Sequence, residues 1–487
     1  MSSIKNIFSS KTLPFWLFTI SAILILTISQ LIQDGVFMDG MLYISVSKNL
    51  ADGMGTFWEP HFSKTVMTVF REQPPLYFGM LAIFFKVFGS SMYVERLYCF
   101  ICFVLTLIYI HKIWKAIFYK EEGIAKNSWL PVLFFASIPV CFWAYANHVE
   151  ETVMTLFATM SVYYLSKALF KNERLVFNIL LAGICVFLSS LTKGIQGMFP
   201  MGGVFLYWLV KKDFTFKKNV IYSTLLVATP FLIYGLFILA NPHIFEVIKL
   251  YLENRLGIAF KGTMHNTTDN RFEIMIRLFT ELIPMLGLML IIFLVHKKSN
   301  PNSTVSRVYK TETLWFLLIG FSGSVPLMST LEQRGFYLLT SLPFFALAGA
   351  TLIANPIAQL VESIKTSNKS FKYTKWVMTI IIIGSTAYTL SCMGKAKRDK
   401  EMLHDVYALG TVIPRGEKLG IPLQMWEKWN FQTYMVRFNY ISLDAYTATN
   451  KFFAIDKGLS KELIPPGYEL HPLKTEYLDL YILKNKQ

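Results

Sequence analysis

Residues 13–33 read LPFWLFTISAILILTISQLIQ, an apolar run that contains no charged side chain. A helix needs about 20 such residues to cross the hydrocarbon core of a bilayer. Only Lys5 and Lys11 precede the run as charged residues, it is too long for the core of a signal peptide, and no small-residue cleavage pattern follows it. We therefore expect an uncleaved membrane span at this position.

Apolar runs of similar length recur along the rest of the chain. Over 487 residues, 54% are hydrophobic and only 16% are charged, which is far from the average of a soluble domain. The sequence predicts an all-α polytopic membrane protein with about 11 to 13 transmembrane helices. A shorter run at 75–88 predicts an interfacial or re-entrant helix. The further predicted spans lie at 92–111, 128–146, 150–170, 176–192, 195–210, 219–240, 278–295, 313–330, 335–354 and 374–393.

The distribution of positive charge predicts the orientation of these spans. Six segments outside the spans hold 21 Lys and Arg against six acids, and so carry nearly all of the net charge of +16. If the N-terminus is cytoplasmic and the C-terminus periplasmic, every one of these segments faces the cytoplasm, as the positive-inside rule requires. A nucleic-acid partner is then not needed to explain the charge. The segments are the N-terminus and residues 112–126, 167–174, 211–218, 297–312 and 362–375.

The composition changes near residue 394. Residues 394–487 hold 14 Lys and Arg and 11 Asp and Glu, with short apolar runs at 452–455 and 478–483 that are typical of strands. We expect a transmembrane domain over residues 1–393 and a small extracytoplasmic α/β domain over residues 394–487.

Two outer loops, residues 34–91 and 241–277, are long enough to contribute to a site. In the first loop, Asp39 precedes apolar residues at helical spacing, a pattern that indicates an amphipathic helix on the membrane surface. Asp39 has two interpretations. It caps the helix, or it acts as a general base or metal ligand held at the bilayer surface.

A second group of polar residues, His148, Glu150 and Glu151, joins two predicted spans on the same outer face. Acids at a helix start often only stabilise that end of the helix. Together with Asp39, however, they provide carboxylates for proton transfer or for a shared divalent cation. His148 is a further candidate ligand, although an interfacial hydrogen-bonding role fits it better.

A substrate with a phosphate leaving group needs cations. Lys193 interrupts two apolar runs in the stretch LTKG, where a charge is expensive unless it has a partner or a function. The alternative is that its side chain extends to the outer interface. Arginine suits bidentate phosphate contacts, whereas lysine acts as a point charge. The outer cations are Arg71, Lys193, Arg255, Lys261 and Arg334.

Taken together, these residues resemble the GT-C membrane glycosyltransferases, in the bacterial branch of the protein O-mannosyltransferases and the aminoarabinose transferase of lipid A modification. The stretch Asp39 to Tyr43 is similar to the family's Asp-Glu-x-x-Tyr segment, with Gly40 in place of the second acid. The stretch Glu72 to Tyr77 resembles Lys-Pro-Pro-Leu-x-Tyr, with Gln73 where a phosphate-binding lysine is common.

The resemblance continues through the membrane region, over about residues 13–355. Glu151 matches the family's second acid at a span start, and Glu150 is one residue out of phase. Leu191 to Gly194 resembles the Leu-Thr-Lys-Gly turn. Other matches are Arg255 and His265 in the second outer loop, and Arg334 with Tyr337 at the Tyr-Leu-Leu-Pro helix start.

The resemblance implies an inverting transfer of a sugar from a polyprenyl-phosphate donor, such as undecaprenyl phosphate, to lipid A, another glycolipid or a protein on the periplasmic face of a bacterial inner membrane. Asp39 would be the base and Glu151 the second catalytic acid, while Arg71, Lys193 and Arg255 neutralise the leaving phosphate. A divalent metal at Asp39, Glu151 and His148 stays open. The enzyme is expected to act as a monomer among membrane lipids. Further substrate contacts are implied for Tyr43, Gln73, Glu150, His265, Arg334 and Tyr337.

Two other classes of protein remain as alternatives. A transporter or flippase of polyprenyl-linked glycans would use the same cations, but it predicts charges at mid-membrane depth, where these spans carry few. A membrane scaffold that acts through its tail would leave Lys193 unexplained. The sequence identifies neither the sugar nor the acceptor.

Overall fold

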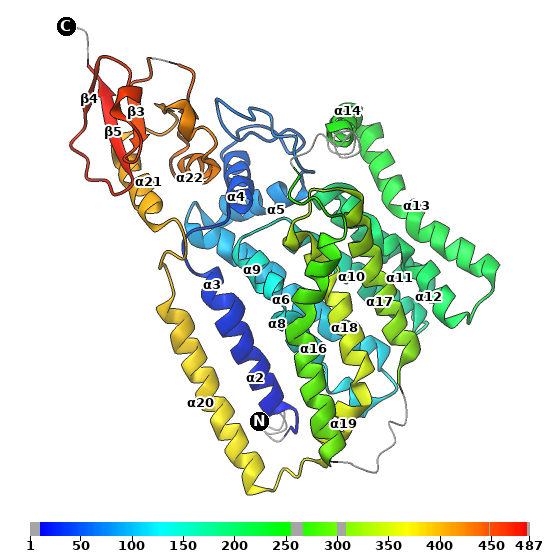
Figure 1. The fold of residues 1–487 in the computed structure, drawn as a ribbon. Helices are drawn as coiled ribbons and strands as arrows, with labels where there is room; N and C mark the ends of the chain where they lie inside the picture. Colours follow the sequence, from blue (N-terminus) through cyan, green and yellow to red (C-terminus); the bar gives the residue numbers. More distant parts are fainter. Residues whose placement is uncertain (1–9, 255–265, 300–307, 448, 485–487) are drawn as a thin grey trace. The chain divides into compact units, whose positions relative to one another are not determined.

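The structure is a computed structural model that describes residues 10–254, 266–299, 308–447 and 449–484 (Figure 1). The chain forms two compact units. The helical unit comprises Met1–Leu31, Cys99–Ala146 and Glu150–Met393, and the mixed unit comprises Ile32–Tyr98, Asn147–Val149 and Gly394–Gln487. Each unit is described by itself.

The helical unit contains helices of 3 to 27 residues. The helix α6 begins in the mixed unit and continues into the helical one. The helices are α2 (Leu13–Ile23), α3 (Ser29–Leu31), α6 (Met92–Ile117), α7 (Glu122–Ala125), α8 (Trp129–Ser137), α9 (Pro139–Ala146), α10 (Glu151–Leu169), α11 (Leu175–Lys193), α12 (Gly203–Lys211), α13 (Phe216–Ala240), α14 (His243–Leu252), α16 (Glu273–Ser299), α17 (Lys310–Ser324), α18 (Leu342–Leu352), α19 (Ala354–Ser363) and α20 (Lys369–Ser391).

Among the described residues, six helical segments are long and apolar enough to cross a membrane, and two bent helix pairs raise this number to eight. The prediction of a polytopic, mostly helical membrane protein is confirmed, and the number of eleven crossings stays a prediction. Two predicted spans, α10 and α20, form helices of 19 and 23 residues but are not among the six. In α10, threonines and the acid Glu151 dilute the apolar residues, and nearly the whole helix is buried.

The span predicted at 128–146 is broken rather than continuous, because α8 and α9 meet at an angle of 72°. Ile138 lies between them with extended backbone angles, φ −75° and ψ 125°. It precedes Pro139, and the proline ring disfavours helical geometry in the residue before it. The span predicted at 335–354 comprises a 3₁₀ helix, Gly335–Thr340, and α18, and α18 forms a second bent pair with α19, at 59°.

The two spans predicted at 176–192 and 195–210 form one continuous helical stretch that reverses direction. The chain turns at Gly194, whose φ of +63° is a left-handed conformation that glycine adopts without a steric penalty. A 3₁₀ helix, Gly194–Gly202, then packs back along α11, so that Gly197 lies directly against the backbone of Ser189. At the far end, the Tyr207 hydroxyl of α12 donates to the Leu169 carbonyl at the end of α10.

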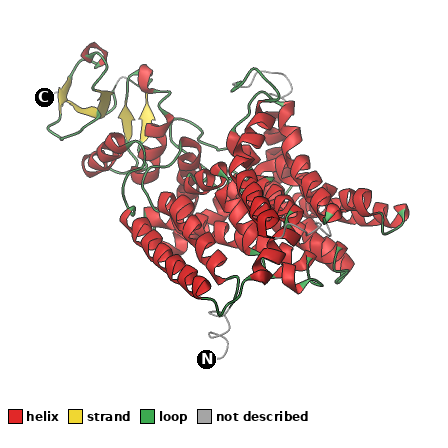
Figure 2. Ribbon diagram, turned by 60° about the horizontal axis from the view of Figure 1, so that its bottom comes forward, coloured by secondary structure: helices red, strands yellow, loops and turns green. Residues whose placement is uncertain are grey.

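The mixed unit contains a five-stranded sheet in the order β2-β1-β3-β5-β4, drawn in yellow in Figure 2. Strand β1 pairs in parallel with β2 and β3, whereas β5 pairs antiparallel with β3 and β4. Both strands predicted in the tail are confirmed as β3 and β5. The strands are β1 (Lys418–Gly420), β2 (Ser442–Asp444), β3 (Phe452–Asp456), β4 (Tyr468–Leu470) and β5 (Leu478–Leu483).

The tail shares this unit with the first predicted outer loop. The loop contains α4 (Met38–Ala51) and α5 (Leu76–Phe88), and the tail adds α21 (Lys400–Val412) and α22 (Trp429–Asn439), which packs on α4. With 13 residues, α5 spans about 20 Å and is too short to cross a bilayer core of about 30 Å. That the tail is a domain by itself stays a prediction, because here it packs together with residues 32–98.

Candidate active site

A buried ion pair lies at the ends of two helices in the helical unit. Lys193 is the last residue of α11 and Glu151 the first residue of α10, and the Lys193 Nζ donates to Glu151 Oε1 at 2.5 Å. The side chains are 7% and 0% exposed. Each charge also has the sign that its helix end favours, because a helix N-terminus attracts anions and a C-terminus attracts cations. In the structure, the Lys193 side chain is buried against Glu151 instead of extending to the water interface.

Aromatic rings cover the Lys193 ammonium. Its Nζ lies 4.8 Å from the centre of the Tyr337 ring and 5.9 Å from that of Phe336, within the range of cation–π attraction. Phe336 in turn stacks on Trp143 at 5.6 Å, and the Tyr337 hydroxyl donates to Glu332 at 3.1 Å. The structure thus brings together three predicted site residues, Glu151, Lys193 and Tyr337.

Asp39 lies in the first turn of α4 in the mixed unit and is half-buried. The N-cap of α4 is Phe37, with φ −57° and ψ 144°, so the alternative that Asp39 caps this helix is wrong. The Phe37 N–H donates to the Asn147 Oδ1 at 3.0 Å, which fixes the start of α4 to the segment that precedes α10 in the sequence. Asp39 still benefits from the helix dipole, and its role as a base stays a prediction.

The structure gives a physical reason for Gly40, the position at which the chain departs from the motif that it resembles. A Cβ atom on Gly40 would lie 1.8 Å from the Asn147 carbonyl oxygen and 3.0 Å from its carbon. Real Cβ atoms do not come so close to backbone atoms. Neither glutamate nor alanine fits at position 40 unless the Asn147 segment moves, so the missing second carboxylate is a consequence of this backbone approach.

The other candidates in the first loop have mainly structural contacts. Arg71, predicted to bind phosphate, donates to Glu59 at 2.6 Å. Tyr43 is buried, with its ring 6.0 Å from that of Tyr77. Gln73 is half-buried in the turn before α5. The charge of Arg71 is thus paired with an acid, as that of Lys193 is paired with Glu151.

His148 is buried in a left-handed conformation with φ +57°. Its backbone carbonyl accepts the Tyr77 hydroxyl at 2.9 Å, and neither ring nitrogen has a hydrogen-bond partner among the described residues. Burial lowers the pKa of His148 well below 6.5, and the nearby charges of Arg96, Lys397 and Arg437 lower it further. The ring is therefore neutral in the folded protein at physiological pH.

This neutral histidine should make stability depend on pH. Below about pH 6.5 the unfolded chain binds a proton at His148 and the folded chain does not. As the pH is lowered below this value, the free energy of unfolding therefore decreases, by up to about 1.4 kcal/mol per pH unit. His148→Asn, which tolerates a positive φ, should flatten this dependence in thermal unfolding scans from pH 5 to 7.5. His404→Asn, a change at an exposed histidine of the same unit, is the control and should leave the dependence intact. Equal slopes for His148→Asn and the unchanged protein would contradict this assignment.

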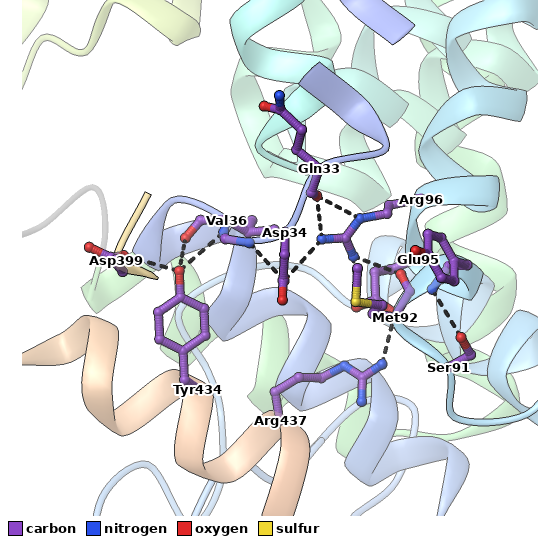
Figure 3. A network of polar contacts seen from close by, with 12 residues as sticks. Gln33, Asp34, Val36, Ser91, Met92, Glu95, Arg96, Asp399, Tyr434 and Arg437 are labelled. Carbon is purple, nitrogen blue, oxygen red and sulfur yellow. Dashed lines mark hydrogen bonds and ion pairs between the residues drawn. The ribbon is translucent and has the colours of Figure 1, made fainter. Parts of the chain in front are cut away.

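A network of buried charges connects the first loop, the start of α6 and the tail (Figure 3). Arg96 donates to the Gln33 carbonyl at 2.7 and 2.9 Å and approaches Asp34 at 3.4 Å. Arg437 of α22 donates to Glu95 at 2.8 Å, and both of these side chains are almost completely buried. The sequence interpretation missed this network, although the adjacent charges Glu95 and Arg96 at the start of an apolar run were a signal.

The same network has a second part in the tail. Tyr434 accepts the N–H of Val36 at 3.1 Å and donates to Asp399 at 3.0 Å, and Tyr407 donates to Asp34 at 2.7 Å. Burial, followed by the hydrogen bond to Asp34, raises the pKa of Tyr407. These bonds tie residues that are nearly 400 positions apart, so the tail holds the start of the first loop in place.

Arg437→Met should therefore destabilise the protein severely. It leaves the Glu95 carboxylate buried without its closest cation, and breaking a buried pair from one side costs about 3–5 kcal/mol. The control is Arg415→Met, because Arg415 is 60% exposed in its pair with Asp52 and such pairs contribute at most about 1 kcal/mol. Thermal unfolding in detergent measures both variants. Equal losses would show that the Arg437–Glu95 pair has no special role.

Two predicted site residues, Arg255 and His265, lie outside the described residues, and so does Lys261. Arg334 is half-buried and precedes the 3₁₀ helix that carries Tyr337. Glu150 is buried beside Glu151. Within the part of the chain that the structure describes, no three His, Cys, Asp or Glu side chains are grouped to hold a metal ion. The described residues thus give no support to the suggested metal site at Asp39, Glu151 and His148.

Comparisons with known proteins agree with this architecture. Residues 72–235 match the model of the dolichyl-phosphate-mannose-protein mannosyltransferase family. The structure resembles the crystal structures of ArnT from Cupriavidus metallidurans, bound to undecaprenyl phosphate (TM-score 0.62, 13% identity, 96% of this chain and 97% of that one) and in the apo state (0.61, 11%, 96% and 96%). It also resembles the apo oligosaccharyltransferase from Archaeoglobus fulgidus (0.50, 12%, 96% and 74%). None of the curated proteins matches the chain.

The match of residues 72–235 to this family and the ArnT-like fold agree with the expected class, a membrane glycosyltransferase of the GT-C fold that uses a lipid-linked sugar. Within this class, its architecture is similar along almost the whole chain to that of ArnT.

Proposed function

We propose that this chain transfers a sugar from a polyprenyl-phosphate donor to a lipid or protein acceptor at the outer face of a bacterial inner membrane, with inversion at the anomeric carbon. The observation that carries the proposal is the buried Lys193–Glu151 pair beside Tyr337, in a fold whose solved relative was crystallised with undecaprenyl phosphate. A buried ammonium at the end of a membrane helix suits a lipid whose tail needs the bilayer and whose phosphate needs a cation.

Lys193 has the donors for this role. An ammonium carries three N–H groups, of which Glu151 uses one, so two remain for phosphate oxygens. Glu151 then acts as a positioning residue that fixes the ammonium, and the rings of Phe336 and Tyr337 exclude water from it. In such a dry site, a fixed charge stabilises a developing anion far more strongly than it would in water.

Asp39 is the proposed base. The acceptor hydroxyl oxygen forms the new bond to the anomeric carbon, its proton passes to the Asp39 carboxylate, and the bond from that carbon to the phosphate oxygen breaks. The departing polyprenyl phosphate gains one negative charge, which Lys193 and Arg255 neutralise. Attack opposite to the leaving phosphate, in one displacement, gives inversion.

The activity is tested with membranes that contain or lack the protein, supplied with a labelled polyprenyl-phosphate sugar. Mass spectrometry of lipids and glycoproteins from both cells then identifies the acceptor. We expect one lipid or protein class to gain a single sugar mass only where the protein is present. Identical lipid and glycoprotein profiles, with no transfer of label, would refute the proposal.

The proposed orientation places the tail in the periplasm. Alkaline phosphatase, which is active only outside the cytoplasm, should therefore be active when fused after residue 393. The matched fusion within the basic segment 211–218 should be inactive, because that segment is proposed to face the cytoplasm. An inactive fusion after residue 393 would contradict a shared outer face for the tail and the first loop.

A further inference from the structure

A large apolar cavity lies in the helical unit, between α2, α8, α16, α19 and α20. Its volume is about 860 Å³, which is within the range of about 300–1,000 Å³ found for ligand pockets. Apolar side chains from all five helices line it: Phe15, Leu133, Ile291, Leu360 and Met378. A lining of this kind suits a hydrocarbon chain.

One end of the cavity is polar. The connection between α19 and α20 contributes Lys365 and Asn368, and the first turns of α20 contribute Ser370 and Thr374. Asn368 is the N-cap of α20 but makes no capping hydrogen bond with its side chain. The first N–H groups of this helix therefore favour an anion beside Lys365.

The charge around this end is positive. The connections at this end belong to the basic segments of the sequence, and residues 362–375 hold four lysines against one acid, Glu362. The Lys11 ammonium donates to the Glu362 backbone carbonyl at 2.5 Å and adds a further positive charge. Further lysines on these segments are Lys297, Lys298, Lys369, Lys372 and Lys375. Basic groups at the end of an apolar groove between membrane helices are the pattern that binds anionic lipid head groups.

The cavity is separate from the candidate active site. Glu151 begins α10, and Lys171, just beyond the end of that helix, lies 5.5 Å from the centre of the Tyr119 ring. Tyr119 is close in sequence to Gly123, where an added Cβ would lie 2.7 Å from the Glu362 carboxylate. The 19 residues of α10 span about 28 Å, so the polar end of the cavity lies about one helix length from Glu151.

We propose that this cavity binds one anionic phospholipid, with its acyl chain between the five helices and its phosphate at Lys365 and the start of α20. The site is distinct from the one proposed for the donor lipid. A free phosphate ion would make no favourable contacts with the apolar walls. A zwitterionic lipid would be attracted less strongly by the surrounding lysines.

The test measures the lipids that remain bound to the purified full-length protein after extensive detergent washing. The rim variant Lys365→Gln/Lys369→Gln should retain on the order of ten-fold less phosphatidylglycerol or cardiolipin than the unchanged protein, because each lysine near a head group contributes about 1 kcal/mol. The wall variant Met378→Trp should also retain less of this lipid, because the larger side chain occupies the space of the lipid's acyl chain. The matched control Lys217→Gln/Lys218→Gln removes two exposed lysines at the start of α13 and should retain it.

Equal retention by all variants, or retention of phosphatidylethanolamine or polyprenyl phosphate in place of an anionic phospholipid, would overturn the proposal. If a variant does not fold, thermal unfolding of the unchanged protein in detergent decides. Added phosphatidylglycerol should raise its melting temperature and added phosphatidylethanolamine should not, whereas equal shifts would refute an anionic site. Neither measurement depends on sugar transfer.

Discussion

Asp39→Asn is expected to reduce sugar transfer by about 10²–10⁴-fold, the usual contribution of a general base. Asparagine has nearly the same shape as aspartate but cannot accept the acceptor's proton at neutral pH. The fold should be retained, because Asp39 is not the N-cap of α4 and the start of that helix is held by the Phe37–Asn147 hydrogen bond. The measurement is the single-turnover rate in membranes with labelled donor and lipid extract.

The matched control is Asp52→Asn. Asp52 follows α4 and pairs with the buried Lys48 and the exposed Arg415, so it offers the same chemical change without a place in the proposed site. Its transfer rate should stay close to that of the unchanged protein. Undiminished transfer by Asp39→Asn, with a normal amount of folded protein, would show that another group activates the acceptor.

Local patterns predicted the parts of the fold that depend on local chemistry. The apolar runs predicted membrane helices, and the aromatic and branched residues of Phe452–Ile455 predicted β3 correctly. The sequence also contained a signal for the bend between α8 and α9, because Ile138 precedes Pro139. The signal was missed because the apolar run continues through these residues.

Contacts between distant parts of the chain were not predictable in this way. Arg437 pairs with Glu95 across 342 positions, and no periodicity in a single sequence indicates such a partner. The clash that excludes a side chain at Gly40 comes from the Asn147 backbone, more than 100 residues away. Lys193 was identified because a charge in an apolar stretch needs a partner, but only the structure identifies that partner as Glu151.

The second large effect is expected at the Lys193–Glu151 pair, where stability and catalysis can be separated. Lys193→Met and Glu151→Gln should each destabilise the protein by about 3–5 kcal/mol, because each leaves one charge buried alone. The double variant removes both charges, and replacing a whole buried pair is often nearly neutral for stability. We therefore expect its thermal unfolding in detergent to return close to that of the unchanged protein.

Transfer should not return with stability. If Lys193 neutralises the leaving phosphate, the folded double variant stays slower by about 10²–10³-fold, the usual cost of removing one group that stabilises a developing charge. Lys193→Arg keeps the charge and should retain more transfer than Lys193→Met. A double variant that regained both stability and transfer would instead make the pair a purely structural one, and the phosphate would need a different cation. Because an intact fold with lost transfer cannot arise from a structural role alone, the double variant distinguishes the two roles of this buried pair.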